Sequence, residues 1–279
     1  TERDYKLLFQ ALRELDEEGR LKVRIGEQCS IPDTDLLRGF FQKGYNHGWG
    51  NNKYRISCIK LFTDGSLGAR TAALRNPYND TPSVKGIEIM TQDEINELVL
   101  LSHRNNCPVA VHAIGDRAIE MSLNAIEYAQ KKHPDNNLRH GIVHCQITDD
   151  ALLNRIKELN VITYIQPIFT DYDMNIVYDR VGKDLAETSY AWKTMINKGI
   201  HASFGTDSPV EKFDTMPNIY SAVTREGITG EVKKVYLPNE KLSMDEALKA
   251  YTLEGAYASG EEDIKGSIAV GKLADFILL

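Results

Sequence analysis

Short runs rich in β-branched and aromatic residues alternate along this chain with amphipathic helical patterns. The six strand-like runs lie at residues 21–29, 55–63, 107–113, 138–146, 161–167 and 201–207. The helical patterns lie at residues 3–19, 91–106, 116–133, 149–160 and 189–199. Strict alternation of this kind is typical of parallel strands joined by helical crossovers. The sequence therefore predicts an α/β fold of the (β/α)8 barrel type.

A closed barrel of this type has eight strand–helix units, and six are visible here. The chain opens inside the helical pattern at 3–19 and stops at the strand-like residues LADFILL (273–279). We therefore expect an amino-terminally incomplete barrel of about six units. Its first and last strands, at 21–29 and 201–207, would then carry unpaired edges that invite pairing with other chains. On this ground we expect a homo-oligomer.

Composition and charge narrow the class of partner. The 279 residues are 42% hydrophobic and 26% charged, which is ordinary for a globular chain long enough to form one large α/β domain. A net charge of −7 gives no electrostatic footprint for nucleic acid or for an anionic membrane. No apolar run is long enough to span a bilayer. A small molecule is therefore the expected partner.

Four cysteines are scattered along the chain, and most lie in or beside apolar strand-like runs. They are Cys29, Cys58, Cys107 and Cys145. Free thiols are common in such buried positions, so we predict that the cysteines are reduced and that the protein is cytoplasmic.

Four strand-like segments end in a residue that a divalent metal could use. Lys60 lies in RISCIKLFTDG, His112 in CPVAVHAIGD, His144 in LRHGIVHCQ and Asp207 in HASFGTDSPV. In a parallel barrel the carboxyl ends of the strands converge on one face, where the connecting loops build the active site. The order Lys, His, His, Asp therefore predicts a metal site on that face.

Each of these residues also has a simpler interpretation. Lys60 could form a salt bridge inside the barrel or act as a Schiff-base lysine. A histidine at a strand end is often only hydrogen-bonded, and we expect this for His140, which precedes its strand. Asp207 stands before Ser-Pro, where an aspartate is well suited to a helix cap or an Asx-turn.

Eight ordered segments carry a family resemblance. They are IKLFTDGSLGARTAAL (59–74), VHAIGDRAIE (111–120), RHGIVHCQ (139–146), IQP (165–167), FGTDSPV (204–210), AVTRE (222–226), LSMDEALKAYT (242–252) and GSIAVGKLADFILL (266–279). Together they resemble the amidohydrolase superfamily, and within it the metal-dependent hydrolases related to N-substituted formamide deformylase. The resemblance runs from about residue 20 to the end of the chain.

The resemblance implies a barrel that carries one or two divalent metals. On the matched motifs, Lys60 is similar to a carboxylated lysine that bridges two metals, and His112 and His144 are similar to ligands of the second metal. Asp207 is similar to the aspartate that completes the site. The resemblance also implies a small β-sandwich, so we divide the chain into a partial barrel at 1–264 and the first sandwich strands at 265–279.

One part of the family pattern is absent from this sequence. The family carries a His-X-His pair on its first strand, and no such pair occurs among the seven histidines. We therefore expect that the first two strands and this pair precede Thr1 in the complete protein, and that the chain by itself is inactive.

The residue types suit this chemistry. Two imidazoles and an oxygen donor fit zinc, but a lysine ammonium has no lone pair to offer. Carboxylation of Lys60 by carbon dioxide would turn it into an anion with two oxygens. A bound metal of this kind lowers the pKa of water toward about 7. Asp207 could then accept the water proton and return it to a leaving amine.

Two connections are too long for simple turns and follow strands on the active-site face. They lie at residues 64–86 and 168–189. Loops of this length are usually functional or disordered, and we assign both to substrate enclosure. Candidate substrate-binding residues in or near this face are Asp64, Asp116, Phe169, Tyr172, Tyr178 and Arg225. The aromatic residues could equally pack the loop down, and Asp116 could cap the helix that follows it.

The expected function is hydrolysis of a C–N bond other than a peptide bond, in an amide or N-substituted formamide. Three alternatives remain open. A mononuclear deaminase would use the histidines and aspartate without a carboxylated lysine, and a Schiff-base aldolase would use Lys60 as its nucleophile. An inactive fragment would have only a structural or interaction role.

Overall fold

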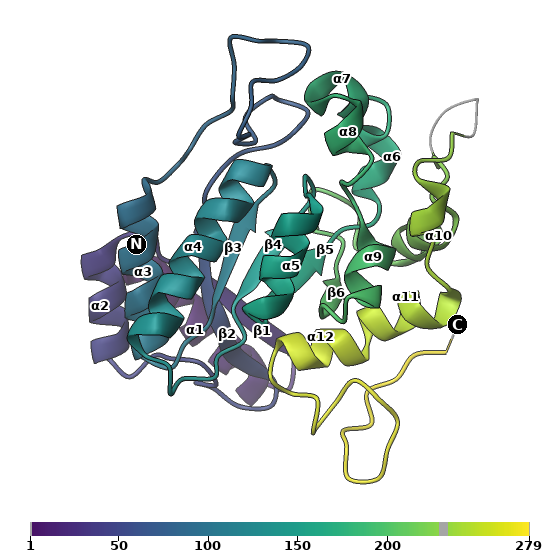
Figure 1. Ribbon diagram of the computed structural model, residues 1–279. Coiled ribbons are helices and arrows are strands. Elements are labelled where there is room, and N and C mark those ends of the chain that lie inside the picture. Colours follow the sequence, from purple (N-terminus) through teal and green to yellow (C-terminus); the bar gives the residue numbers. More distant parts are fainter. Residues whose placement is uncertain (1, 229–233, 279) are drawn as a thin grey trace.

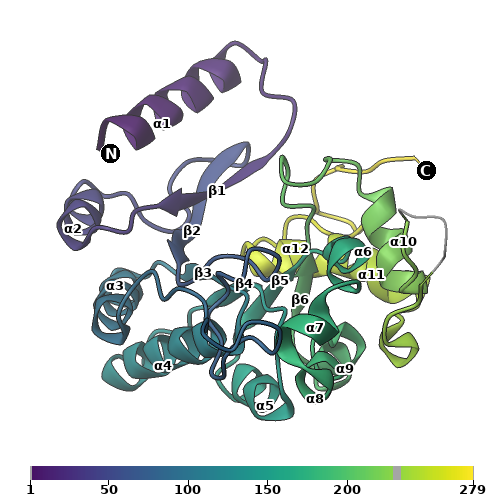
Figure 2. The same cartoon turned by 90° about the horizontal axis from the view of Figure 1, so that it is seen from above.

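The computed structural model describes residues 2–228 and 234–278 and contains one parallel sheet. Its strands are β1 (Ile25–Ser30), β2 (Tyr54–Phe62), β3 (Val109–Ala113), β4 (Gly141–His144), β5 (Ile162–Ile165) and β6 (Ala202–Phe204). The spatial order is β1-β2-β3-β4-β5-β6, and every neighbouring pair is parallel. Seen from above, the sheet curls into a partial barrel (Figure 2). The predicted α/β barrel fold with about six units is confirmed.

Helices surround the sheet, and those that follow β2, β3 and β4 cover its outer face (Figure 1 and Figure 2). The longer ones are α1 (Glu2–Glu17), α2 (Thr34–Gln42), α3 (Gln92–Arg104), α4 (Asp116–Lys132), α5 (Asp150–Glu158), α10 (Met216–Thr224) and α11 (Met244–Tyr251). The short ones are α6 (Phe169–Asp173), α7 (Val177–Val181), α8 (Lys183–Ala186), α9 (Trp192–Asn197), α12 (Leu253–Ala258) and the 3-10 turn η1 (Pro238–Glu240). Capping boxes start two of them: Thr91 and Glu94 in α3, and Ser243 and Glu246 in α11.

The alternation of side chains along the strands places the site. Cys58, Ala110, Val143 and Tyr164 form a small cluster of their own, apart from the main core. Because side chains alternate with a period of two, residues two positions farther along β2 and β3 lie on the same face. Those residues include Lys60 and His112. The apolar cluster is therefore the layer beneath the candidate site.

The helices α11 and α12 cover the end of the sheet at which the strands begin, below the strands in Figure 1. His201, just before β6, contacts Glu254 at 2.7 Å and stacks on Tyr257 with ring centroids 3.9 Å apart. Arg139, just before β4, donates to the carbonyl of Tyr257 at 2.8 Å and to Glu262 at 2.6 Å. These contacts leave the carboxyl ends of the strands free for the long connections at the top of Figure 1.

Some boundaries differ from those predicted. The strands predicted at 21–29 and 201–207 are observed at Ile25–Ser30 and Ala202–Phe204, and the remaining residues of each run lie outside the sheet. The connection at 168–189 is not an irregular loop, since it contains α6, α7 and α8. Residues 265–278 have no strand, so the expected sandwich strands and the domain boundary remain predictions.

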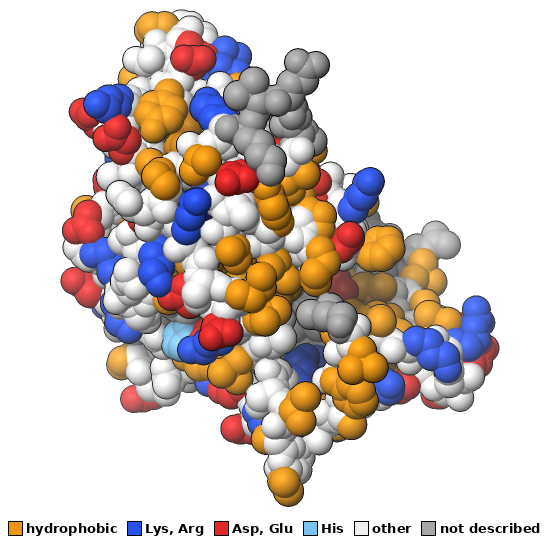
Figure 3. All heavy atoms as spheres, turned by 90° about the vertical axis from the view of Figure 1, so that its right-hand side faces the viewer, with side chains coloured by type: hydrophobic (Ala, Val, Ile, Leu, Met, Phe, Trp, Pro, Cys, Tyr) orange, Lys and Arg blue, Asp and Glu red, His pale blue; other side chains and the backbone are white. Residues whose placement is uncertain are grey.

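The remaining expectations concern the cysteines, the surface and the sheet edges. All four cysteines are buried and free. Within the described residues no helix has the length and apolarity that a membrane crossing requires. Hydrophobic side chains gather on the face that lies at the right of Figure 1 (Figure 3). In the described part of the chain β1 and β6 each have one neighbour, and the homo-oligomer stays a prediction.

Candidate active site

The structure brings the predicted ligands to one end of the sheet. Lys60 lies in β2, His112 in β3 and His144 at the last position of β4, while Asp207 lies in the turn after β6. The parallel register aligns Lys60 with Ala110 and His112 with Val143. The rings of His112 and His144 are 4.5 Å apart between centroids, at an angle of 75°.

The charges of these side chains act on one another. Burial lowers the pKa of Lys60 to about 8, against the opposing effect of the Asp207 carboxylate. Burial also lowers the pKa of His144 to about 3, with further lowering by His112 and Lys60. Asp207 lies in an exposed turn, yet the atoms around its carboxylate displace water and raise its pKa, while Lys60 and His112 oppose this rise. The four groups therefore form one electrostatic cluster.

The ring of His144 is held by the side chain of Gln166, which follows β5. Nδ1 of His144 lies 2.7 Å from Oε1 of Gln166, and Nε2 of Gln166 donates to the carbonyl of Tyr164 at 3.2 Å. The second bond fixes the orientation of the amide, so its oxygen faces the imidazole and Nδ1 must carry the proton. Nε2 of His144 then keeps its lone pair for a ligand.

The ring of His112 is held from the connection after β2. Its Nε2 lies 3.0 Å from the carbonyl oxygen of Gly65 and 3.4 Å from Oδ1 of Asp64. A carbonyl oxygen only accepts hydrogen bonds, so Nε2 of His112 is the protonated nitrogen. Nδ1 therefore keeps its lone pair. Both histidines have the arrangement of metal ligands, with one ring nitrogen fixed by an outer partner and the other available.

Asp64 connects this partner to the backbone of two segments. Its fully buried carboxylate accepts hydrogen bonds from the backbone N–H groups of Ala73 at 2.9 Å, Ile114 at 3.0 Å and Gly115 at 2.8 Å. These bonds tie the connection after β2 to the end of β3. The expected contact of Asp64 with substrate has no support in this placement, because its oxygens face the backbone and His112.

Two further candidates are buried and bonded to backbone groups. Asp116 is buried at the start of α4 and accepts from the backbone N–H groups of Arg75 and Arg117, both at 3.0 Å. Arg225 is fully buried, and burial lowers its pKa to about 10. Its guanidinium donates to the carbonyl oxygens of Tyr236 and Tyr190, at 2.9 and 3.1 Å. In this structure both residues make contacts that stabilise the fold.

The aromatic candidates in the second long connection differ from one another. Phe169 stacks on His144, with ring centroids 5.8 Å apart and an interplanar angle of 18°. Tyr172 has 53% of its surface exposed, and the neighbouring Glu211 raises its pKa. Tyr178 packs edge-on against Tyr236 at 6.1 Å. Phe169 is the one of these three that directly contacts a candidate ligand.

The two long connections are joined to each other above the strands. Asp80, in the first connection, pairs with Arg70 at 2.8 Å and also with Arg180 of α7. The backbone N–H of Asn79 donates to the carbonyl of Arg180 at 2.8 Å. Figure 1 shows both segments on the side of the sheet where the strands end. The two connections are thus bonded to each other, and their role in substrate enclosure stays a prediction.

The donor set fits a divalent metal only if Lys60 contributes. Within residues 2–228 and 234–278, no three His, Cys, Asp or Glu side chains are grouped closely enough to hold a metal ion. His112 and His144 supply two nitrogen donors, so an anionic oxygen donor in place of the Lys60 ammonium would be needed. With a pKa of about 8, a fraction of Lys60 is an uncharged amine at neutral pH, the form that can react with carbon dioxide.

Sequence reasoning missed the outer partners of both histidines. Gln166 lies directly after β5, so a polar residue at a strand end was the available signal. Gly65 contributes a backbone carbonyl, which no side-chain pattern indicates. His140 is hydrogen-bonded as expected, because its Nε2 lies 2.9 Å from Nδ1 of His103.

Comparison with known proteins places the chain in a family. Residues 3–279 match the model of the amidohydrolase family. The chain is 40% identical over 225 residues to the putative amidohydrolase YtcJ of Bacillus subtilis, covering 80% of this chain and 42% of that protein. It is 24% identical over 228 residues to N-substituted formamide deformylase of Arthrobacter pascens, covering 81% of this chain and 41% of that enzyme.

The chain is also similar to a solved structure. An uncharacterized metal-dependent hydrolase from Pyrococcus furiosus superposes with a TM-score of 0.82 at 36% identity, covering 95% of this chain and 52% of that one. The chain thus spans less than half the length of these curated relatives and about half of that structure. From the family match and these likenesses, the chain belongs to the amidohydrolase family.

Proposed function

We propose that the complete protein is a metal-dependent hydrolase of C–N bonds other than peptide bonds, acting on an amide or an N-substituted formamide. The observation that carries the proposal is the paired arrangement of His112 and His144. Each ring has one nitrogen fixed by an outer partner and one lone pair left, and the rings lie 4.5 Å apart. The similarity to N-substituted formamide deformylase supports the substrate class.

The residues that would hold the metal are His112 through Nδ1, His144 through Nε2 and Lys60 as its carboxylated form, with Asp207 completing the set. When bound, a zinc ion lowers the pKa of water and makes a nucleophile available near neutral pH. Asp207 suits proton transfer, because its surroundings raise its pKa above that of an ordinary aspartate. It would accept the proton of the attacking water and return that proton to the leaving amine. Phe169 and the joined connections would exclude bulk water.

Lys60 distinguishes this proposal from the alternatives. A lowered pKa also suits a Schiff-base nucleophile, but the two histidines with free lone pairs would then have no use. A deaminase without the carboxylated lysine would tolerate an uncharged residue at this position. The decisive experiment is therefore a replacement of Lys60 with chemical rescue.

The experiment compares wild-type full-length protein with Lys60→Ala, in zinc or manganese, on a panel of N-formyl and N-acyl amines. We expect Lys60→Ala to lower turnover by at least about 100-fold, since even outer partners of metal ligands cost up to this much. Short carboxylic acids should partly restore the rate by replacing the carbamate. Lys193→Ala is the control, because Lys193 pairs with Glu246 away from the site.

Three results would contradict the proposal. An unchanged rate in Lys60→Ala with intact metal content would show that the lysine is structural. Loss of the Lys60→Ala rate without any rescue, together with borohydride trapping of a carbonyl substrate on wild type, would favour the aldolase. Turnover of aminated heterocycles in place of the amide panel would favour the deaminase.

A further inference from the structure

We propose that Arg75 is a positioning residue that joins the three connections following the ligand-bearing strands β2, β3 and β4. Arg75 lies in the connection after β2, which also contains Asp64 and Gly65. The inference rests on the proposed function, because it concerns the metal site that Lys60, His112 and His144 would form.

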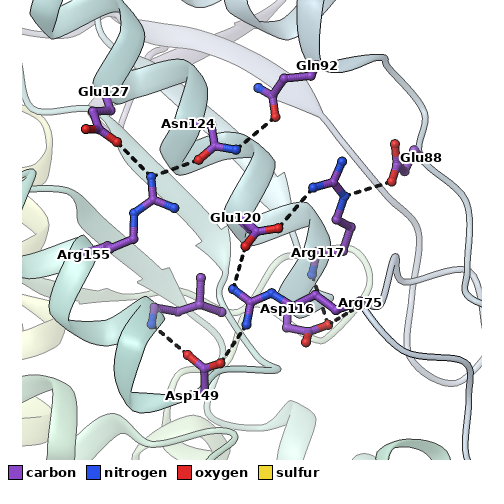
Figure 4. A network of polar contacts seen from close by, with 11 residues as sticks. Arg75, Glu88, Gln92, Asp116, Arg117, Glu120, Asn124, Glu127, Asp149 and Arg155 are labelled. Atoms are coloured by element: carbon purple, nitrogen blue, oxygen red, sulfur yellow. Dashed lines mark hydrogen bonds and ion pairs between the residues drawn. The ribbon is translucent and has the colours of Figure 1, made fainter.

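The contacts of Arg75 reach both neighbouring connections (Figure 4). Its Nη1 donates to Oδ2 of Asp149 at 2.7 Å, and its Nη2 donates to Oε1 of Glu120 at 3.1 Å. Its backbone N–H donates to Oδ1 of Asp116 at 3.0 Å. Asp116 and Glu120 belong to α4, which follows β3, whereas Asp149 follows β4.

The residues that Arg75 contacts lie close in sequence to the ligands. Asp149 caps α5, accepting from the backbone N–H of Leu152 at 2.8 Å, and stands in the short connection after His144. Asp116 begins α4 in the short connection after His112. A shift of either acidic residue would therefore be transmitted to a strand end that carries a ligand.

The backbone close to Arg75 packs tightly against the connection that follows β3. The carbonyl of Ala73 accepts from the backbone N–H of Arg117 at 3.1 Å. A Cβ atom added at Gly115 would lie 1.9 Å from the carbonyl oxygen of Ala73, so only glycine permits this approach. Asp64 bonds Ala73 and Gly115 from the other side. Arg75 extends this contact outward to Glu120 and Asp149.

Arginine is suited to pairing with Glu120 and Asp149 at the same time. Its planar guanidinium presents several donors in a fixed fork, so one residue can hold two carboxylates from different elements at once. The side chains of Arg75, Glu120 and Asp149 are 29%, 30% and 34% exposed, so water screens these ion pairs in part. We therefore expect Arg75 to affect the geometry of the site more than the overall stability.

The test measures zinc affinity of full-length protein by competition with a chelator, alongside thermal unfolding. Arg75→Ala should weaken zinc binding about tenfold, within the range for outer partners of metal ligands. Arg75→Lys should restore part of the loss, because an ammonium can pair with one of the two carboxylates. Asp149→Asn keeps a good helix cap but loses the charge, and it should weaken zinc binding in the same direction.

Arg155→Ala is the matched control. Arg155 also pairs with α4, donating to Asn124 at 2.9 Å and Glu127 at 3.0 Å, and its side chain is 30% exposed. Figure 4 shows it beside the same helix, away from the Arg75 contacts. Its removal should leave zinc affinity unchanged while lowering stability by a similar amount.

The outcomes separate the two claims. Wild-type protein without measurable zinc affinity would overturn the proposed function and the inference that rests on it. Zinc binding in wild type with equal affinity in Arg75→Ala and Asp149→Asn would overturn the positioning role alone. If Arg75→Ala does not fold, Asp149→Asn decides the question. Equal losses of affinity in Arg75→Ala and Arg155→Ala would show a general effect of stability and would also contradict the inference.

Discussion

Gln166, directly after the neighbouring strand β5, holds His144 with its side-chain oxygen 2.7 Å from Nδ1 of the imidazole. The amide nitrogen of Gln166 is occupied by the carbonyl of Tyr164. This pair fixes both the orientation of the ring and the nitrogen that carries the proton. Removal of the Gln166 side-chain oxygen should therefore weaken metal binding by His144.

Gln166→Leu keeps the approximate size of the side chain and removes the hydrogen-bond acceptor. We expect zinc affinity to fall by about 10- to 100-fold, because the His144 ring loses its outer partner. Gln130→Leu is the control. Gln130 lies near the carboxyl end of α4, away from the ligands, and donates to the carbonyl of Leu159. Chelator competition gives the affinities, and equal values for the two variants would show that Gln166 does not orient the ligand.

The backbone hydrogen bonds of Asp64 predict that its replacement lowers the stability of the folded protein. Asp64→Asn keeps the shape of the side chain but turns one acceptor into a donor that faces backbone N–H groups. Because each hydrogen bond to a charged group contributes about 1.5–3 kcal/mol, we expect the free energy of unfolding to fall by about 3 kcal/mol. Urea unfolding measures this difference.

Asp33→Asn provides the comparison for Asp64. Asp33 caps α2 by accepting from the backbone N–H of Leu36 at 2.7 Å, and asparagine caps helices as well as aspartate does. Its free energy of unfolding should therefore stay close to that of wild type. If Asp64→Asn lowers the free energy of unfolding no more than Asp33→Asn does, the backbone hydrogen bonds of Asp64 do not stabilise the fold as predicted.

The buried pair His103 and His140 predicts a pH dependence of stability. Nδ1 of His140 accepts from the backbone N–H of Val109 at 3.1 Å, so a second proton on this ring would face a donor. Burial lowers the pKa of His140 to about 3. An unfolded histidine titrates near about 6.5, so between these values the unfolded chain binds more protons and stability falls as the pH is lowered.

His140 should contribute up to about 1.4 kcal/mol per pH unit to the slope, beginning as the pH falls below about 6.5. Unfolding in urea at pH 7, 6 and 5 measures it. His140→Gln should reduce the slope, whereas His133→Gln should retain it, because the ring of His133 contacts Arg104 outside the buried pair. The same slope in wild type and His140→Gln would contradict the assignment to His140.

Much of this architecture could be predicted from the sequence. The β-branched runs around Lys60, His112 and His144 indicate strands, and parallel strands bring their carboxyl ends together. The convergence of these residues therefore follows from local pattern and one rule of topology. The lengths of β1 and β6 could not be predicted, because tertiary packing decides where a short strand begins and ends.

Other features depend on contacts that a sequence does not reveal. The helices α6, α7 and α8 are only four or five residues long, too short for a helical period to be recognised. Asp64 and Arg225 both looked like substrate contacts, since polar residues near a strand end or motif suggest function. The structure surrounds them with backbone hydrogen bonds, and that outcome depends on segments distant in the chain.

The central claim is that His112 and His144 hold a divalent metal together with Lys60. The most direct test is elemental analysis of full-length protein purified in zinc, comparing wild type with the double variant His112→Ala/His144→Ala and the control His133→Ala. We predict at least one zinc ion fewer per chain in the double variant, and wild-type content in the control. Equal zinc content in all three proteins, each shown to be folded, would contradict the account.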